Sequence, residues 1–426
     1  MRILTDSYPS IVQTPRELRA IGKIVTAGIP DVDDVTVYIA QTNDRGLRAT
    51  IQRIEVSKAL TLFNLGASGH PFPPVSFIGE SNDKNWKIEL ENIAFQNQHV
   101  KSSGISILEG PVGRVIARRR PSASHRRTLI GIGDIVTGGF SPLRMSTMSN
   151  GSPGLSIQRV IVPLPPLSGD PKHSLCLHMV SHDLRKFVRK EKIGNHPVLS
   201  AFLVEQSPAP RDPEDLLVGE IRSMLAFASG SSAHIVCVYN IDDSELPYHI
   251  EFRDAPSSVC QPSFAALPLF DLPRRNYFGD FVSQSRAHWK SASGFDFNLV
   301  MHFILDSTDN PFLEIRFATL SVAFEVLASH HAAATGFSRE LKDMRIGKYK
   351  SFGDLLNEIC AQAGISWNSK DFIDIRNKIL HEGTLLPIAT FAKYCEFVNV
   401  FHQVILKIVK YSGTYNDVRT FSNGTI

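Results

Sequence analysis

The chain has 426 residues, of which 43% are hydrophobic, 20% charged and 9% aromatic, and its formal net charge at pH 7 is +3. These fractions exclude a disordered or fibrous chain, and the length exceeds what a single hydrophobic core usually holds. The net charge is too small to indicate a nucleic-acid partner unless basic residues gather locally.

The first part of the chain, residues 1–255, consists mostly of short segments rich in β-branched residues with turn residues between them. In residues 86–91 apolar and polar side chains alternate strictly, which is typical of a strand buried on one face. Many strands at such short spacing predict a β-sandwich or a related barrel, and we assign 1–255 to a β-sandwich-like domain. The clearest predicted strands are 35–40, 86–95, 156–162 and 235–239.

One helix is predicted inside this β-rich region, over residues 213–228, and Gly230 ends it. After the last predicted strand, residues 256–275 contain several prolines, which remove amide donors and disfavour helix before them. We therefore predict that 256–275 links two domains. The prolines are Pro256, Pro262, Pro268 and Pro273.

From residue 276 to 426 the apolar pattern becomes helical. Two long amphipathic helices are indicated by apolar side chains at steps of three and four residues. Shorter helices are predicted at 295–305, 351–362 and 370–381, so the whole is an α+β protein that ends in an all-α bundle of four or five helices. The two apolar series are Leu313, Phe317, Leu320, Phe324 and Leu327, and Phe391, Tyr394, Val398, Phe401, Ile405 and Ile408.

The most informative segment is 374–383, DIRNKILHEG. Gly383 is a typical residue just beyond a helix, so His381 lies in the last turn, where exposed carbonyls favour an imidazolium. Asn377 precedes His381 by four residues and shares its face. Arg376 lies about 140° around the helix axis from His381, so that only its long side chain would approach the imidazole.

These residue types suit RNA cleavage. A ribose 2′-OH loses a proton as it attacks the neighbouring phosphorus and the leaving 5′-oxygen gains one, and a histidine can carry out both transfers. A guanidinium binds the phosphate oxygens that gain charge. We assign His381 as the acid/base, Arg376 as the phosphate ligand and Asn377 as an orienting residue. No metal or other cofactor is required.

The Arg-x4-His pattern at a helix end, with Asn after the Arg, resembles the HEPN superfamily of ribonucleases over residues 276–426. A β-rich region followed by such a domain is similar in organisation to the ApeA-like abortive-infection proteins of antiphage defence. The resemblance implies a homodimer in which Arg376 and His381 of two chains share one cleft around an RNA phosphate. It also implies an N-terminal region that senses a phage-derived trigger.

Other charged residues have weaker assignments. Glu325, Arg316 and Asp374 either support the same cleft or make ordinary polar contacts. A basic stretch before the helix at 351–362 either holds an RNA backbone or is a solvated loop. A second basic cluster in the β-rich region either binds phosphates or is a charged loop. The first stretch contains Arg339, Lys342, Arg345, Lys348 and Lys350, and the second contains Arg114, Arg118, Arg119, Arg120, Arg126 and Arg127.

The five cysteines are scattered, without a Cys-x-x-Cys pair, which favours a reducing compartment. No apolar run is long enough for a membrane span or a signal peptide, so we expect a cytoplasmic protein. Two hypotheses remain open. The chain is a metal-independent endoribonuclease, or its helical part is a non-catalytic dimerisation scaffold beside a ligand-recognising β-domain.

Overall fold

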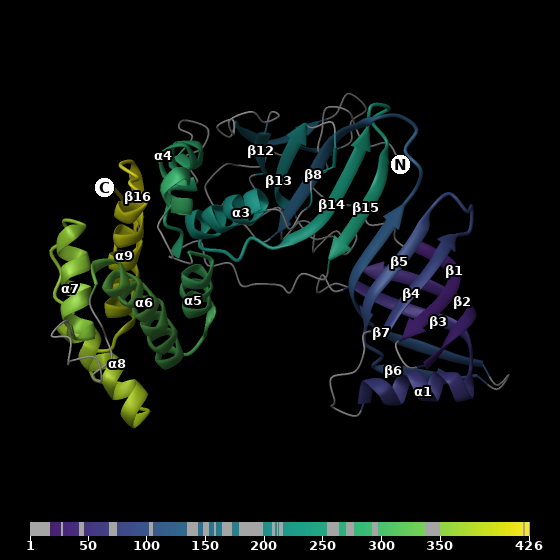
Figure 1. Cartoon of the computed structure of the whole chain (residues 1–426), viewed down its shortest axis with the longest axis horizontal. Helices are drawn as coiled ribbons and strands as arrows, with labels where there is room; N and C mark the ends of the chain where they lie inside the picture. Colours follow the sequence, from purple (N-terminus) through teal and green to yellow (C-terminus); the bar gives the residue numbers. More distant parts are fainter. Residues whose placement is uncertain are drawn as a thin grey trace.

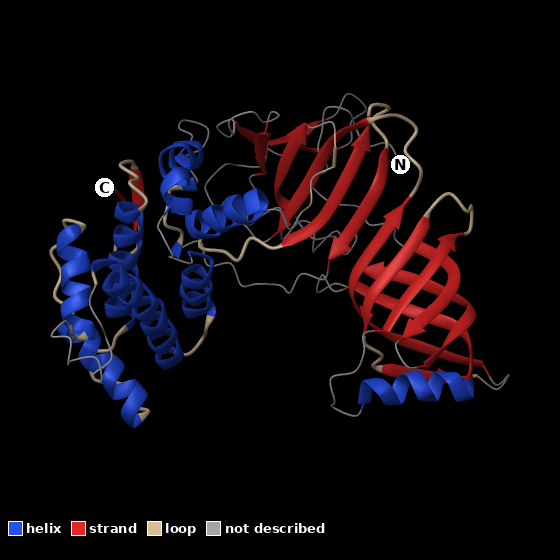
Figure 2. Ribbon diagram, viewed as in Figure 1, coloured by secondary structure: helices blue, strands red, loops and turns tan. Residues whose placement is uncertain are grey.

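The computed structural model shows a β-rich region followed by a helical region (Figure 1, Figure 2). A closed barrel lies at one end of the molecule, an open sheet in the middle and the helices at the other end. The structure describes residues 18–26, 29–41, 47–67, 75–101, 105–133, 144–147, 153–156, 159–163, 173–178, 199–206, 209–210, 212, 216–253, 264–269, 277–291, 297–336, 350–420 and 422–425.

One long strand, β7 (Ile105–Arg118), organises the β-rich region. Its first half pairs with β3 and its second half with β5, which closes the order β7-β3-β2-β1-β4-β5 into a barrel with antiparallel neighbours. The other barrel strands are β1 (Leu18–Thr26), β2 (Ile29–Gln41), β3 (Leu47–Glu55), β4 (Val75–Ser81) and β5 (Lys87–Ile93). The short strand β6 (Asn97–Val100) also pairs with β7, and helix α1 (Val56–Ala67) follows β3.

The sheet continues beyond the barrel because the second half of β7 also pairs with β15 on its other edge. The order from there is β15-β14-β8-β13-β12-β11, again antiparallel. These strands are β8 (His125–Gly133), β11 (Arg159–Pro163), β12 (His173–His178), β13 (Leu199–Gln206), β14 (Ile235–Asp242) and β15 (Pro247–Arg253). The strands β9 (Arg144–Thr147) and β10 (Pro153–Ser156) form a separate pair.

The helical region contains two long helices and several shorter ones. The long helices are α6 (Leu313–Thr335) and α9 (Phe391–Ile408). The others are α4 (Tyr277–Ser291), α5 (Phe297–Asp309), α7 (Phe352–Gln362) and α8 (Lys370–Glu382). Rings from α6, α8 and α9 pack together, with the centroids of Phe324 and Phe372 4.7 Å apart and those of Phe372 and Phe397 5.1 Å apart. The core of this region therefore joins the helix that carries the Arg-x4-His pattern to both long helices.

Two hydrophobic cores fill the molecule. One fills the barrel and continues along one face of the open sheet, through residues such as Val236 and Tyr239 of β14. The other joins the helical region to α3 (Leu216–Ser229) and to the opposite face of the open sheet, including Val238 of β14. Since β14 contributes to both cores, every residue of this strand is buried. The open sheet is thus the layer shared by the barrel and the helices.

The predicted order of a β-rich region before a helical one is confirmed. Of the two predicted β-architectures the structure has the barrel, because β7 closes six strands, and the narrower assignment of 1–255 to a sandwich-like domain is wrong. The predicted division between residues 255 and 276 also differs from the packing. Helix α3 belongs to the helical core, and residues 264–269 of the predicted linker are largely buried against it. Their amides bond to the end of α3, from Ala266 N to the Phe227 carbonyl at 3.3 Å.

The C-terminal hairpin holds the same linker segment from its other side. It is formed by β16 (Thr414–Asp417) and β17 (Ser422–Thr425). The side-chain amide of Asn416 donates to the carbonyls of Ala265 and Leu267 at 3.0 and 2.8 Å. Its backbone N–H donates to the carbonyl of Ala266 at 2.9 Å. In the described part of the chain, no helix combines the length and the apolar character that crossing a bilayer demands.

Candidate active site

Helix α8 presents the Arg-x4-His pattern at its C-terminal half. Phe372 and Ile375 are fully buried and fix the inner face of the helix. The helix ends at Gly383, which has a φ of 66° and donates its amide to the carbonyl of Ile379 at 2.9 Å. This left-handed residue confirms the predicted helix end and leaves His381 in the last turn. Asn377 and His381 are both exposed, as expected for residues four apart on the outer face.

Arg376 is anchored to the neighbouring helices. Its Nη2 donates to Oε1 of Glu325 on α6 at 2.6 Å, and its Nη1 donates to Oδ1 of Asn377 at 2.9 Å. The guanidinium carbon lies 5.1 Å from the centre of the Phe352 ring, at the start of α7. Both charged side chains of the ion pair are mostly buried, with exposed fractions of 22% for Arg376 and 23% for Glu325. Three helices therefore determine where this guanidinium lies.

His381 has a different environment from Arg376. The residue is exposed, and among the described side chains none bonds to its imidazole. Arg376 contacts Glu325 and Asn377 but not His381, so one chain does not bring the two predicted catalytic groups into contact. The imidazole remains accessible to a ligand or to a second chain.

The remaining sequence-based assignments have mixed outcomes. Glu325 lies beside the pattern through its ion pair with Arg376, whereas Asp374 is exposed and has no ion-pair partner among the described residues. Arg316 does not lie beside Arg376. It is buried near the N-terminal end of α6, and its guanidinium carbon lies 5.6 Å from the ring centres of both Phe391 and Tyr394. In the basic stretch, Arg339, Lys342, Arg345 and Lys348 lie outside the described residues, whereas Lys350 is paired with Glu358.

Phe352 is the site residue that sequence reasoning missed. Its ring supports the guanidinium of Arg376, although 24 positions separate the two residues in the sequence. Ser351 caps α7 by accepting the amide of Asp354 at 3.2 Å, which makes Phe352 the first helical residue. The local sequence indicates this cap. No local pattern predicts that the ring of Phe352 meets α8, because that contact depends on how the two helices pack.

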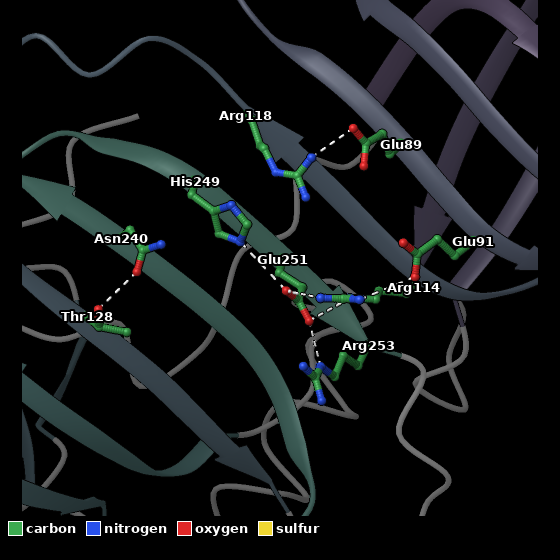
Figure 3. Close-up of polar contacts among 9 residues, drawn as sticks. All are labelled: Glu89, Glu91, Arg114, Arg118, Thr128, Asn240, His249, Glu251 and Arg253. Atoms are coloured by element: carbon green, nitrogen blue, oxygen red, sulfur yellow. Dashed lines mark hydrogen bonds and ion pairs between the residues drawn. The ribbon is translucent and has the colours of Figure 1, made fainter. Parts of the chain in front are cut away.

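Several arginines of the second basic cluster pair with acidic side chains, and Figure 3 shows the partners of Arg114 and Arg118 on neighbouring strands. At its centre Glu251 on β15 accepts two bonds from Arg114 at 2.8 Å each, and one from Arg253 at 2.6 Å. Arg114 also reaches Glu91 at 3.3 Å. Burial opposes ionisation of Glu251, but hydrogen bonds from His249, Arg114 and Arg253 outweigh it and lower the pKa of this carboxyl well below its usual value.

Three other arginines of that cluster also have acidic partners, whereas Arg119 donates to the carbonyl of Pro247 at 2.8 Å. Arg118 donates to Glu89 at 2.8 Å, and both Arg126 and Arg127 pair with Glu245. All of these pairs use donors that a phosphate would need, and the pair of Arg118 with Glu89 also stabilises the sheet by joining two strands. The cluster therefore stabilises the strands around β7 and β8, and it is a weaker candidate for phosphate binding than its sequence indicates.

Within the described residues no group of three or more His, Cys, Asp or Glu side chains could hold a metal ion. Comparison with protein-family models, with curated proteins and with solved structures found no match to this chain.

Proposed function

We propose that this protein is a metal-independent endoribonuclease of the HEPN type that acts on single-stranded or loop RNA. The observation that supports this proposal best is the arrangement on α8. A guanidinium is anchored by Glu325 and Asn377, while a histidine is exposed one turn further along the same helix. The pair supplies a phosphate ligand and a proton carrier on one helix.

In the proposed reaction the ribose 2′-oxygen attacks the adjacent phosphorus as His381 removes its proton. The bond from phosphorus to the 5′-oxygen breaks, and the leaving oxygen takes a proton from an imidazolium. The products are a 2′,3′-cyclic phosphate and a 5′-hydroxyl, with no net consumption of water or cofactor. Arg376 stabilises the charge that develops on the phosphoryl oxygens, which is the largest contribution expected of such a group. Asn377 orients Arg376 through its side-chain oxygen.

The proposed site contains residues from two chains. The guanidinium of Arg376 contacts groups of its own chain, and His381 has no contact with it. A two-fold dimer that pairs the α8 surfaces places the His381 of one chain near the Arg376 of the other. Leu380 lies on that surface with 50% of its area exposed, so it offers apolar contact area for such a dimer.

The resemblance to ApeA-like proteins extends the proposal to a biological role. In it the chain is the effector of an antiphage abortive-infection response, and the β-rich region responds to a phage-derived trigger. Within the β-rich region the barrel is the candidate for binding the trigger, since its core is distinct from that of the helices. Comparing the toxicity of the full chain with and without phage infection tests the role independently of the chemistry.

RNA cleavage by the wild type and by His381→Ala tests the chemistry. The reaction contains EDTA, and the fragment ends are analysed for 2′,3′-cyclic phosphate. The wild type is expected to produce these ends and His381→Ala is not. His302→Ala is a matched control, because His302 is an exposed histidine on α5 of the same helical region. Equal cleavage by all three proteins would remove the ribonuclease proposal and favour the non-catalytic scaffold.

A further inference from the structure

We infer that Glu325 is a positioning residue for Arg376, and that it orients the guanidinium for an RNA phosphate while lowering the affinity for that phosphate. This inference rests on the proposed function. Glu325 lies on α6 and is 51 residues from Arg376 in the sequence, so the contact exists only because α6 packs against α8. The N–O distance of 2.6 Å is that of a short, charge-assisted hydrogen bond.

After its bonds within the chain, the guanidinium of Arg376 keeps enough N–H donors to bind a phosphate. A guanidinium has five N–H groups, one on Nε and two on each terminal nitrogen. The Nε atom is buried without an acceptor. Nη1 uses one hydrogen for Asn377 and Nη2 uses one for Glu325. One hydrogen remains on each terminal nitrogen, which matches two phosphate oxygens bound by one arginine.

Three contacts restrict the plane of the guanidinium. Glu325 and Asn377 each hold one terminal nitrogen, and the Phe352 ring supports the group at 5.1 Å. Without Glu325 the guanidinium keeps only its contacts with Asn377 and Phe352. It can then rotate and bind the phosphate in orientations that do not support the reaction. An orientation that is set before substrate binds contributes to the chemical step, because no ordering is then required in the transition state.

The same carboxylate reduces attraction to RNA. Its negative charge lies against the guanidinium and offsets part of the field that a phosphate experiences. A variant that keeps the oxygen acceptor but removes the charge separates these two effects. Glu325→Gln retains an acceptor at the same position, whereas Glu325→Ala removes both the acceptor and the charge. A purely structural role predicts neither a separation of kcat from affinity nor rescue by Gln.

Two measurements test the inference on the full-length chain with a short RNA oligonucleotide. The first is kcat at saturating RNA for the wild type, Glu325→Ala and Glu325→Gln. We expect Glu325→Ala to lower kcat by about 10- to 100-fold and Glu325→Gln to lower it by no more than about threefold. The second is the RNA dissociation constant in a His381→Ala background. We expect both Glu325 substitutions to tighten binding by about threefold or more at low salt.

Glu396→Gln is the matched control, because Glu396 on α9 is in a half-buried ion pair with Lys393 at 3.0 Å. Its kcat and dissociation constant are expected to equal those of the wild type, and an equal tightening there would overturn the assigned role of the Glu325 charge. Unchanged or raised kcat in Glu325→Ala would overturn the positioning role, while the ribonuclease assignment stands if His381→Ala is inactive. Full cleavage by both Arg376→Ala and His381→Ala would overturn the proposed function and the inference together.

Discussion

Arginines that face carboxylates occur in two regions of this molecule, with opposite consequences. Arg114, at the junction of the barrel and the open sheet, bonds Glu251 through two nitrogens and Glu91 through a third contact. Arg376, in the helical region, meets a single oxygen of a single carboxylate. Glu251 is 2% exposed and Glu325 is 23% exposed. The acids around Arg114 use its donors within the fold, whereas the bonds of Arg376 to Glu325 and Asn377 leave some of its N–H donors unused.

The surroundings of the two arginines strengthen this contrast. Around Arg114, acidic and basic side chains alternate across β5, β7 and β15, so that charge is balanced within the sheet. Five residues after Arg376, the same helix carries an exposed histidine with no bonded side chain among the described residues. The comparison indicates that basic residues counted along a sequence do not identify a phosphate site, because the acids that neutralise them come from other strands.

The largest expected effect separates the two arginines by activity. Arg376→Lys keeps the charge but loses the planar, two-point geometry, and we expect it to lower RNA cleavage by about 100-fold. Arg118→Lys alters a cross-strand pair near Arg114 and is expected to leave cleavage within about twofold, since surface pairs contribute little. The measurement is the initial rate on one RNA under identical salt. A similar loss in both variants would mean that the arginine cluster on the sheet also serves the reaction.

The second effect separates the two carboxylates by stability. Glu251→Ala leaves Arg114 and Arg253 without their shared buried acceptor, and we expect the free energy of unfolding to fall by about 2 to 4 kcal/mol. Glu325→Gln retains an acceptor on a partly exposed pair and is expected to lower it by less than about 1 kcal/mol. Urea unfolding followed by circular dichroism measures both values. Equal losses would show that the Glu325 pair is as structural as the Glu251 network.

The third effect concerns pH. The folded-state pKa of Glu251 is lowered from the usual 4.5, so its contribution to stability is complete above the unfolded-state pKa and is lost as pH falls toward the folded-state value. The difference in unfolding free energy between the wild type and Glu251→Gln is therefore expected to be constant from pH 7 to about pH 5 and to shrink below about pH 4. Denaturant unfolding at a series of pH values measures it. A difference that grows toward acid pH would contradict the assignment of Glu251 as an ionised acceptor.

The sequence predicts much of the local structure but few of the contacts between residues that lie far apart in the chain. The apolar periodicity locates α6 and α9, and the Gly383 end of α8 follows from its neighbours, because these features depend on contacts within a few turns. The ion pair of Arg376 with Glu325 depends on helix packing across 51 positions. Closure of the barrel depends likewise on β7 pairing different strands along its two halves, which no alternation of apolar residues encodes.

The smallest effect tests the helix end that supports His381. Gly383 has a φ of 66°, where an added Cβ meets no atom within 4 Å, so the penalty for Ala there comes from the backbone alone. Gly383→Ala is expected to lower the free energy of unfolding by about 1 kcal/mol, and Gly383→Asn by less because Asn tolerates this conformation. If His381 acts from an ordered last turn, cleavage falls more in Ala than in Asn, in the same order as stability. Cleavage that is insensitive to both substitutions would mean that His381 acts without support from the helix end. The imidazole would then need no fixed position for the reaction, in contrast to the guanidinium of Arg376, which three contacts restrict.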